Sequence, residues 1–159
     1  MNTADIIQAL HNTPILFIGS GISRRYLGLP NWDGLLEHFA QLVRSDKFAY
    51  GGYKNKAQQD MPLTASLIEA DFNKKWFADA AFRTVTNEEW LEQISTGDLS
   101  PFKAEMAEYI RSFDNFTPNY EKEILKLKQL STNHLSGIIT TYYDGFVEYI
   151  APAYQVYVG

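Results

Sequence analysis

A glycine-rich turn near the N-terminus is the part of the sequence best suited to chemistry. Residues 19–23 read Gly-Ser-Gly-Ile-Ser and directly follow a short apolar run at residues 14–18. Successive backbone N–H groups in such a turn can bind a phosphate, because glycine carries no side chain that would keep the anion away. A tight turn without a ligand accounts for the same residues equally well, since Gly-x-Gly alone is a weak signal.

Two better-known phosphate motifs do not fit this turn. The third glycine of a hydride-transfer fingerprint would fall at Arg24, and the acidic residue expected about 20 residues later would fall in helix and loop. The Gly-Lys-Ser/Thr sequence of a P-loop is absent. Arg24 and Arg25 follow the turn, where they either pair with a diphosphate or form a solvated pair.

The elements that must position this turn alternate between short apolar strands and helices. Strands are predicted at 14–18, 136–141 and 154–158, and ligands bind at the carboxyl ends of parallel strands. The predicted fold class is α/β: a partial, Rossmann-like, doubly wound parallel sheet with helices on both faces and an exposed apolar edge at its first strand. Capping residues and apolar spacing predict helices at 3–10, 31–43, 64–81, 87–94, 101–112, 118–130 and 144–151, with a loop at 45–62.

Composition narrows the class of protein. The chain has 159 residues, with 45% hydrophobic and 14% aromatic residues, which suffices for one domain with a core. The net charge of −5 argues against a nucleic-acid partner, and the absence of cysteine excludes disulfides and thiolate zinc sites. Neither a secretory signal nor a membrane span is expected, so the predicted location is the cytoplasm.

Two longer strings carry a resemblance to a known family. Residues 19–36 read GSGISRRYLGLPNWDGLL, and residues 136–148 read SGIITTYYDGFVE. Together they resemble the sirtuin family, in particular its bacterial sirtuin-like branch, which opens with Gly-Ala-Gly-Ile-Ser, continues to Gly-Ile-Pro and an aromatic residue, and later ends a strand in Thr-x-Asn-x-Asp. The matching residues are Gly19, Gly21, Ile22, Ser23, Gly28, Pro30, Trp32, Thr140, Thr141, Tyr143 and Asp144.

The resemblance implies a domain that binds NAD and breaks its nicotinamide–ribose bond through an oxocarbenium-like centre. By that likeness Gly19, Ser20, Gly21, Ile22 and Ser23 hold the diphosphate. Pro30, Asn31 and Trp32 lie over the nicotinamide ribose, and Thr140 and Thr141 lie beside the adenosine or ribose. Asp144 accepts a hydrogen bond from the nicotinamide amide, and Tyr143 stacks on a base.

The sequence departs from the family at two catalytic positions. Tyr142 stands where the family has the Asn that contacts the ribose and positions the attacking water. The segment Lys-x-His-Gly, which carries the family's general base, does not occur. His11, His38 and His134 are interpreted as surface or helix-end residues. The catalytic candidates are therefore Tyr142 and Asp144, and we expect weak or no activity.

The missing cysteines also shift the likeness away from zinc-containing deacetylases. A helical insert at about 60–131 in place of a zinc module is typical of sirtuin-like NAD hydrolases in bacterial antiphage defence. The prediction is that residues 1–159 form the N-terminal part of such a domain, with NAD as ligand, no metal, and either a homo-oligomer or a further C-terminal portion as partner. The alternatives are a non-catalytic module that binds NAD or ADP-ribose, a partner subunit, and a domain for another nucleotide.

Overall fold

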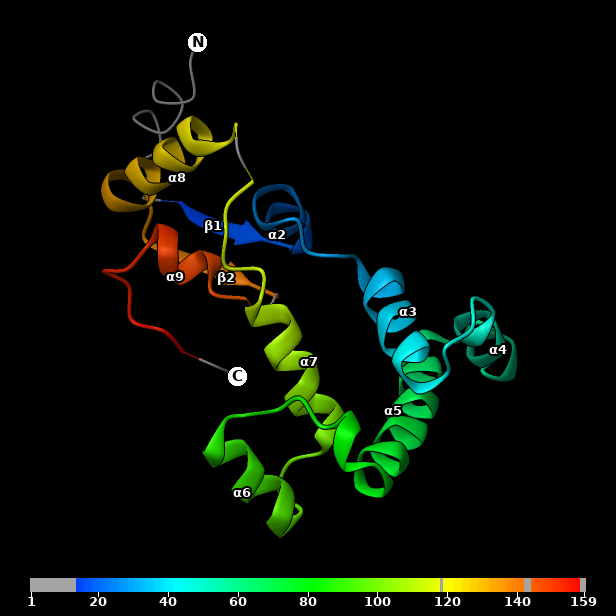
Figure 1. Cartoon of the computed structure of the whole chain (residues 1–159). Coiled ribbons are helices and arrows are strands. Elements are labelled where there is room, and N and C mark those ends of the chain that lie inside the picture. The colour runs from blue at the N-terminus through cyan, green and yellow to red at the C-terminus, as the bar shows by residue number, and fades with distance from the viewer. Residues whose placement is uncertain (1–13, 118, 142–143, 158–159) are drawn as a thin grey trace. The chain divides into compact units, whose positions relative to one another are not determined.

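A computed structural model describes residues 14–117, 119–141 and 144–157. Eight α-helices and two β-strands occur in this part of the chain, and helix accounts for 62% of it. The chain divides into two compact units (Figure 1). We call Met1–Leu29 with Phe113–Gly159 the sheet unit, and Pro30–Ser112 the helical unit.

The sheet unit is built on two adjacent parallel strands. Strand β1 (Ile15–Ile18) pairs with β2 (Gly137–Thr140) so that Ile15 faces Gly137 and Ile18 faces Thr140. Three helices complete the unit: α2 (Ser20–Leu27), α8 (Glu121–His134) and α9 (Phe146–Ile150). Its aromatic packing centres on Tyr26, which stacks on Phe146 with ring centroids 5.3 Å apart.

The predicted doubly wound, Rossmann-like parallel sheet is wrong. The described residues form one two-stranded sheet in a mostly helical chain, so no fold of that class is present among them. The third strand predicted at 154–158 does not form over residues 154–157. There the Tyr154 hydroxyl lies 2.6 Å from the carbonyl oxygen of Ser131 and 2.7 Å from that of Leu135, which ties this segment to the end of α8.

The helical unit contains α3 (Trp32–Val43), α4 (Ala49–Lys56), α5 (Met61–Ala78), the 3-10 turn η1 (Ala80–Phe82), α6 (Glu88–Thr96) and α7 (Pro101–Arg111). Helix α4 lies in the segment that was predicted as a loop. Four of these helices begin at a residue whose side chain accepts a hydrogen bond from the first turn, which satisfies one otherwise unpaired N–H. The four capping residues are Asn31, Asp60, Asn87 and Ser100.

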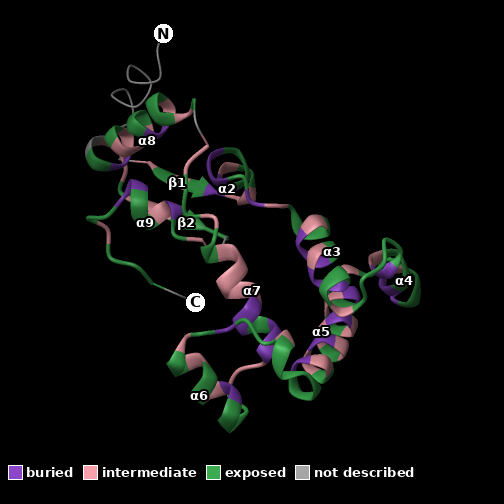
Figure 2. Cartoon of the chain, viewed as in Figure 1, coloured by how far each residue is buried: buried purple, intermediate pink, exposed green. Residues whose placement is uncertain are grey.

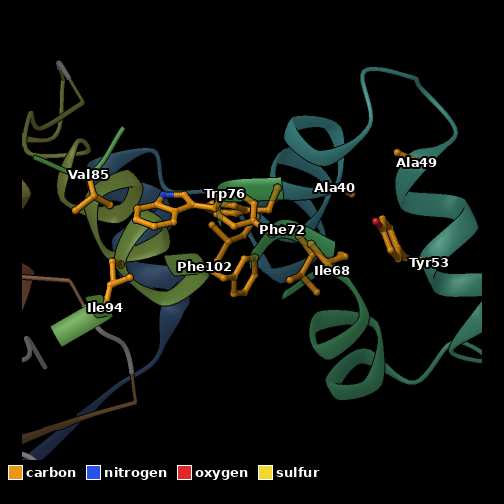
Figure 3. Packing of buried hydrophobic residues seen from close by; sticks show 13 residues of the cluster. Ala40, Ala49, Tyr53, Ile68, Phe72, Trp76, Val85, Ile94 and Phe102 are labelled. Atoms are coloured by element: carbon orange, nitrogen blue, oxygen red, sulfur yellow. The ribbon is translucent and has the colours of Figure 1, made fainter. Parts of the chain in front are cut away.

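The core of the helical unit is aromatic. Phe39, Phe72 and Phe102 are each at most 4% exposed, and their rings pack edge to face with centroids 5.1–5.6 Å apart. Figure 3 shows Phe72, Phe102 and Trp76 packed against one another, with Ile68 nearby and Tyr53 entering from α4. This packing gives the helices a common interior, so the unit is held by burial as well as by caps.

The two strands of the sheet unit are much less covered. Figure 2 colours much of β1 as exposed, and Ile15 and Phe17 are 61% and 66% exposed. Because side chains alternate along a strand, these two residues share one face of the sheet with Ile139, which is 50% exposed. Ile18, on the opposite face, is 2% exposed. The expected strand buried on both sides is therefore buried on one side only, at its carboxyl end.

Candidate functional site

The carboxyl ends of β1 and β2 bring the two sequence motifs together. Ile18 and Thr140 are partners in the strand register, and the Thr141 N–H donates to the Ile18 carbonyl at 3.3 Å. Gly19 and Thr141 therefore leave the sheet at the same edge, from neighbouring strands (Figure 1). This is the edge of a parallel sheet at which ligands bind in open α/β sheets.

Helix α2 begins at this edge without a capping side chain. Gly19 is its N-cap, in an extended conformation with φ −104° and ψ 177°, and the first turn contains no acidic residue. The one backbone bond that closes this turn runs from the Ile22 N–H to the Gly19 carbonyl at 3.2 Å. The positive end of the helix is thus left without the side-chain oxygen that caps α3, α5, α6 and α7, and it can accept an anion.

The two glycines of the turn have no steric role in the chain itself. A Cβ atom placed on Gly19 or Gly21 would meet no other atom within 4 Å. Neither residue has a positive φ angle, in contrast to Gly28 at the end of α2, where φ is 72°. Helix formation therefore accounts for Gly28 but leaves Gly19 and Gly21 without a structural reason.

Asp144 follows the end of β2 and has one carboxylate oxygen without a partner. Its Oδ1 accepts from the Phe146 N–H at 2.9 Å, which holds the first turn of α9. Its Oδ2 is buried and receives no hydrogen bond in the described structure. A buried acceptor without a donor costs about 1–3 kcal/mol, so a ligand N–H at this atom would be stabilising.

The two arginines after the turn differ in what they contact. Arg25 forms a bidentate pair with Glu123 at 3.0 Å and lies over the ring of Tyr120, 4.4 Å from its centroid. The Tyr26 hydroxyl donates to the same carboxylate at 3.0 Å, and the Arg25 and Tyr26 hydrogen bonds lower the pKa of Glu123. Arg25 therefore joins α2 to α8. Arg24 is exposed, and no interaction of its side chain occurs in the described part of the chain.

The remaining predicted ligand contacts are distributed over both units. Thr140 and Thr141 are exposed at the end of β2, whereas Ser23 is only 2% exposed, on the inner face of α2. Pro30, Asn31 and Trp32 belong to the helical unit, where the Asn31 side chain accepts from the Gly34 N–H at 2.9 Å. Tyr142 and Tyr143 lie outside the described residues.

The described histidines lie in different surroundings. His38 stacks on Tyr109 in the helical unit with ring centroids 4.1 Å apart, and burial lowers its pKa. It is more buried than the surface position predicted for it. His134 is the last residue of α8, as the helix-end interpretation requires, and His11 lies outside the described residues.

Sequence reasoning missed α2 itself, and with it the Arg25–Glu123 contact. The signal was present, because Ser23, Tyr26 and Leu27 recur at helical spacing and are the buried residues of α2. Two properties of the described part of the chain bear on binding. It contains no group of three or more His, Asp or Glu side chains placed to hold a metal ion. None of its helices is long and apolar enough to cross a membrane.

Comparison with known proteins identifies no relative: no family model, no curated protein and no solved structure matches this chain.

Proposed function

We propose that the sheet unit binds NAD at the edge where β1 and β2 end. The observation that carries this proposal is the meeting of two incomplete groups at one sheet edge: the uncapped start of α2 and the unpartnered Oδ2 of Asp144. The first requires an anion and the second requires an N–H donor. NAD offers both, because its diphosphate is anionic and its nicotinamide carries a carboxamide.

The glycines support the same mode of binding. Gly19 and Gly21 leave open space beside the first N–H groups of α2, and a diphosphate would approach the backbone there. Arg24, exposed and with no competing carboxylate in the described structure, supplies a charge for the phosphates. The motif resemblance selects NAD from other nucleotides, since the sirtuin-like pattern assigns the diphosphate to residues 19–23 and the nicotinamide amide to Asp144.

We infer further that the chain derives from an NAD-hydrolysing antiphage effector and that it binds NAD with weak or no turnover. Tyr142 stands at the position of the family's Asn, and neither described histidine lies in the turn or at the strand ends. Orienting a dinucleotide needs only the anion site and the Asp144 acceptor, whereas cleavage also requires a positioned water. A non-catalytic NAD or ADP-ribose module is favoured over an efficient hydrolase for this reason.

Binding is tested by calorimetric titration with NAD, ADP-ribose and ATP. Gly21→Ala should weaken NAD and ADP-ribose alike, by roughly tenfold or more, because its methyl group occupies the approach to the phosphates. Asp144→Asn keeps an oxygen for the Phe146 N–H but replaces the free acceptor with an amide donor. It should therefore weaken NAD and leave ADP-ribose unchanged, since ADP-ribose has no carboxamide.

The matched control is Gly52→Ala in α4 of the helical unit, where a Cβ also meets nothing within 4 Å. This variant should bind NAD as the parent does. Absence of NAD and ADP-ribose binding to the parent, or tighter binding of ATP than of either, would contradict the proposal.

Turnover is tested separately with Tyr142→Asn. Release of nicotinamide from NAD by this variant, and not by the parent, would assign the parent to the hydrolase class with a blocked ribose site. Intact NAD binding without release would assign it to the binding modules.

A further inference from the structure

The strongest feature outside the proposed NAD site is an apolar hollow in the helical unit. It has a volume of about 390 Å³ and is lined by Trp32 and Leu36 of α3 and by Met61, Pro62 and Ala65 of α5. These residues occupy the first turns of the two helices, so the hollow opens between two helix starts that lie side by side. Trp32 is 52% exposed, although it belongs to an otherwise well-packed unit.

The hollow lacks the features of a small-molecule site. Pockets for small ligands combine apolar walls with a few polar groups that fix the ligand's orientation. Here the accessible lining is wholly apolar. An apolar cleft with a half-exposed tryptophan is instead the pattern of an anchor site, in which one bulky side chain of a protein partner is buried and Trp supplies most of the contact.

The charges beside the hollow are mainly negative. Asp33 and Glu37 follow two of the lining residues on α3, and both act on Tyr50, whose hydroxyl donates to Asp33 Oδ1 at 2.7 Å. Tyr50 also contacts the Met61 sulfur at 3.8 Å, which places this group against the wall of the hollow. Lys54, at 3.1 Å from the same Asp33 oxygen, balances one of the two acids. The Tyr50 and Lys54 bonds lower the pKa of Asp33, so it stays ionised.

We propose that this hollow is a docking site for a protein segment that presents a bulky apolar side chain flanked by basic residues. The apolar side chain enters between α3 and α5 against Trp32, and the flanking positive charge faces Asp33 and Glu37. Charge complementarity selects a basic partner over an acidic one, and burial of the anchor provides most of the affinity. This inference is independent of the proposed NAD site, which lies in the sheet unit.

The test uses two capped octapeptides that share a central Leu-Phe pair, one flanked by arginines and one by glutamates. Binding is followed by NMR at two probes inside the site, the Trp32 indole N–H and the Met61 methyl group. The arginine peptide should shift both signals saturably, and the glutamate peptide should shift neither at the same concentration. Shifts of equal size with both peptides, or with neither, would overturn the proposal.

Two variants separate anchor from charge. Ala65→Leu fills the hollow and should weaken the arginine peptide by roughly tenfold, while Ala70→Leu makes the same change at an exposed position of α5 and should have no effect. Glu37→Lys should weaken the arginine peptide and allow the glutamate peptide to bind. Unchanged affinity of the arginine peptide for Ala65→Leu would place it elsewhere and refute the site. NAD affinity should be unaltered in all three variants.

Discussion

The helical unit and the sheet unit satisfy their polar and apolar groups to different degrees. Four helices of the helical unit begin at side-chain caps, and its large aromatic residues are buried together. In the sheet unit α2 begins uncapped, Asp144 keeps a buried oxygen without a donor, and Phe17 is 66% exposed. The residues of the helical unit are therefore explained by folding, whereas several in the sheet unit require a binding partner to explain them.

This difference separates residues selected for stability from residues available for function. An unsatisfied buried acceptor and an uncapped helix each lower stability, and such costs concentrate at functional sites. The comparison can be tested unit by unit, because all three tryptophans, at positions 32, 76 and 90, lie in the helical unit. Tryptophan emission then follows unfolding of that unit, and amide hydrogen exchange follows the sheet unit.

The largest contrast is expected between two phenylalanine truncations. Phe72→Ala removes a ring that is 1% exposed and packs on Phe39, Phe82 and Phe102, and should lower the unfolding free energy of the helical unit by about 4 kcal/mol. Phe17→Ala in β1 should cost less than about 0.5 kcal/mol. Denaturant titration with tryptophan emission and hydrogen exchange measures the two. A Phe17 effect as large as that of Phe72 would show that the strand is as tightly packed as the helical core.

A second prediction concerns the buried carboxylate of Glu105, which is 7% exposed. It accepts from the Trp76 indole N–H at 3.2 Å, from the Thr84 N–H at 2.9 Å, from the Thr84 hydroxyl, and from the Val85 N–H at 3.2 Å. Glu105→Ala should destabilise the helical unit by about 3 kcal/mol, because these donors are left unpaired. Glu105→Gln keeps an acceptor oxygen and should cost about 1 kcal/mol. Equal losses in the two variants, measured by thermal unfolding, would mean that charge rather than donor pairing matters.

Local sequence signals predicted much of the structure where they agreed with packing. The apolar runs before Gly19 and after Ser136 gave both strands to within one or two residues at each end, because Gly and Pro bound them. Asn31 and Ser100 gave the starts of α3 and α7, because N-caps are visible as residue types. The pairing of the two strand ends, and hence the position of the candidate site, followed from the same signals.

The errors arose where tertiary contacts decide the conformation. Helix α4 contains Gly51 and Gly52, which disfavour helix, but Ala49 and Tyr53 are buried in the core and hold it. The strand predicted from Tyr154 failed because the Tyr154 hydroxyl finds carbonyl groups at the end of α8. The unpartnered oxygen of Asp144 was not predictable, since sequence does not report which acceptors lack donors.

A third prediction converts the sheet unit to the pattern of the helical unit. Gly19→Asp places a capping carboxylate at the start of α2, where the extended backbone and open space accept a side chain. It should stabilise α2 by a few tenths of a kcal/mol, since Asp caps better than Gly and favours the helix dipole. Hydrogen exchange at the α2 amides should slow, and NAD affinity should fall more than tenfold because the carboxylate repels the diphosphate. Slower exchange with unchanged NAD affinity would separate the helix start from the ligand.

The smallest expected effect is an acid sensitivity of the contact between α2 and α8. The hydrogen bonds from Arg25 and Tyr26 lower the pKa of Glu123 from its ordinary value of 4.5. A carboxyl group whose pKa is lower in the folded state contributes stability that is present above 4.5 and is lost as the pH falls through the folded value. Hydrogen exchange of α2 and α8 should therefore accelerate below pH 4.5 in the parent. Glu123→Gln should exchange faster at pH 7 and change less on acidification, whereas Glu121→Gln, on the same helix without the Arg25 contact, should behave as the parent does. If the Glu123→Gln variant kept the parent's pH dependence, another group would be responsible, and the sheet unit would be held together differently from the way its contacts indicate.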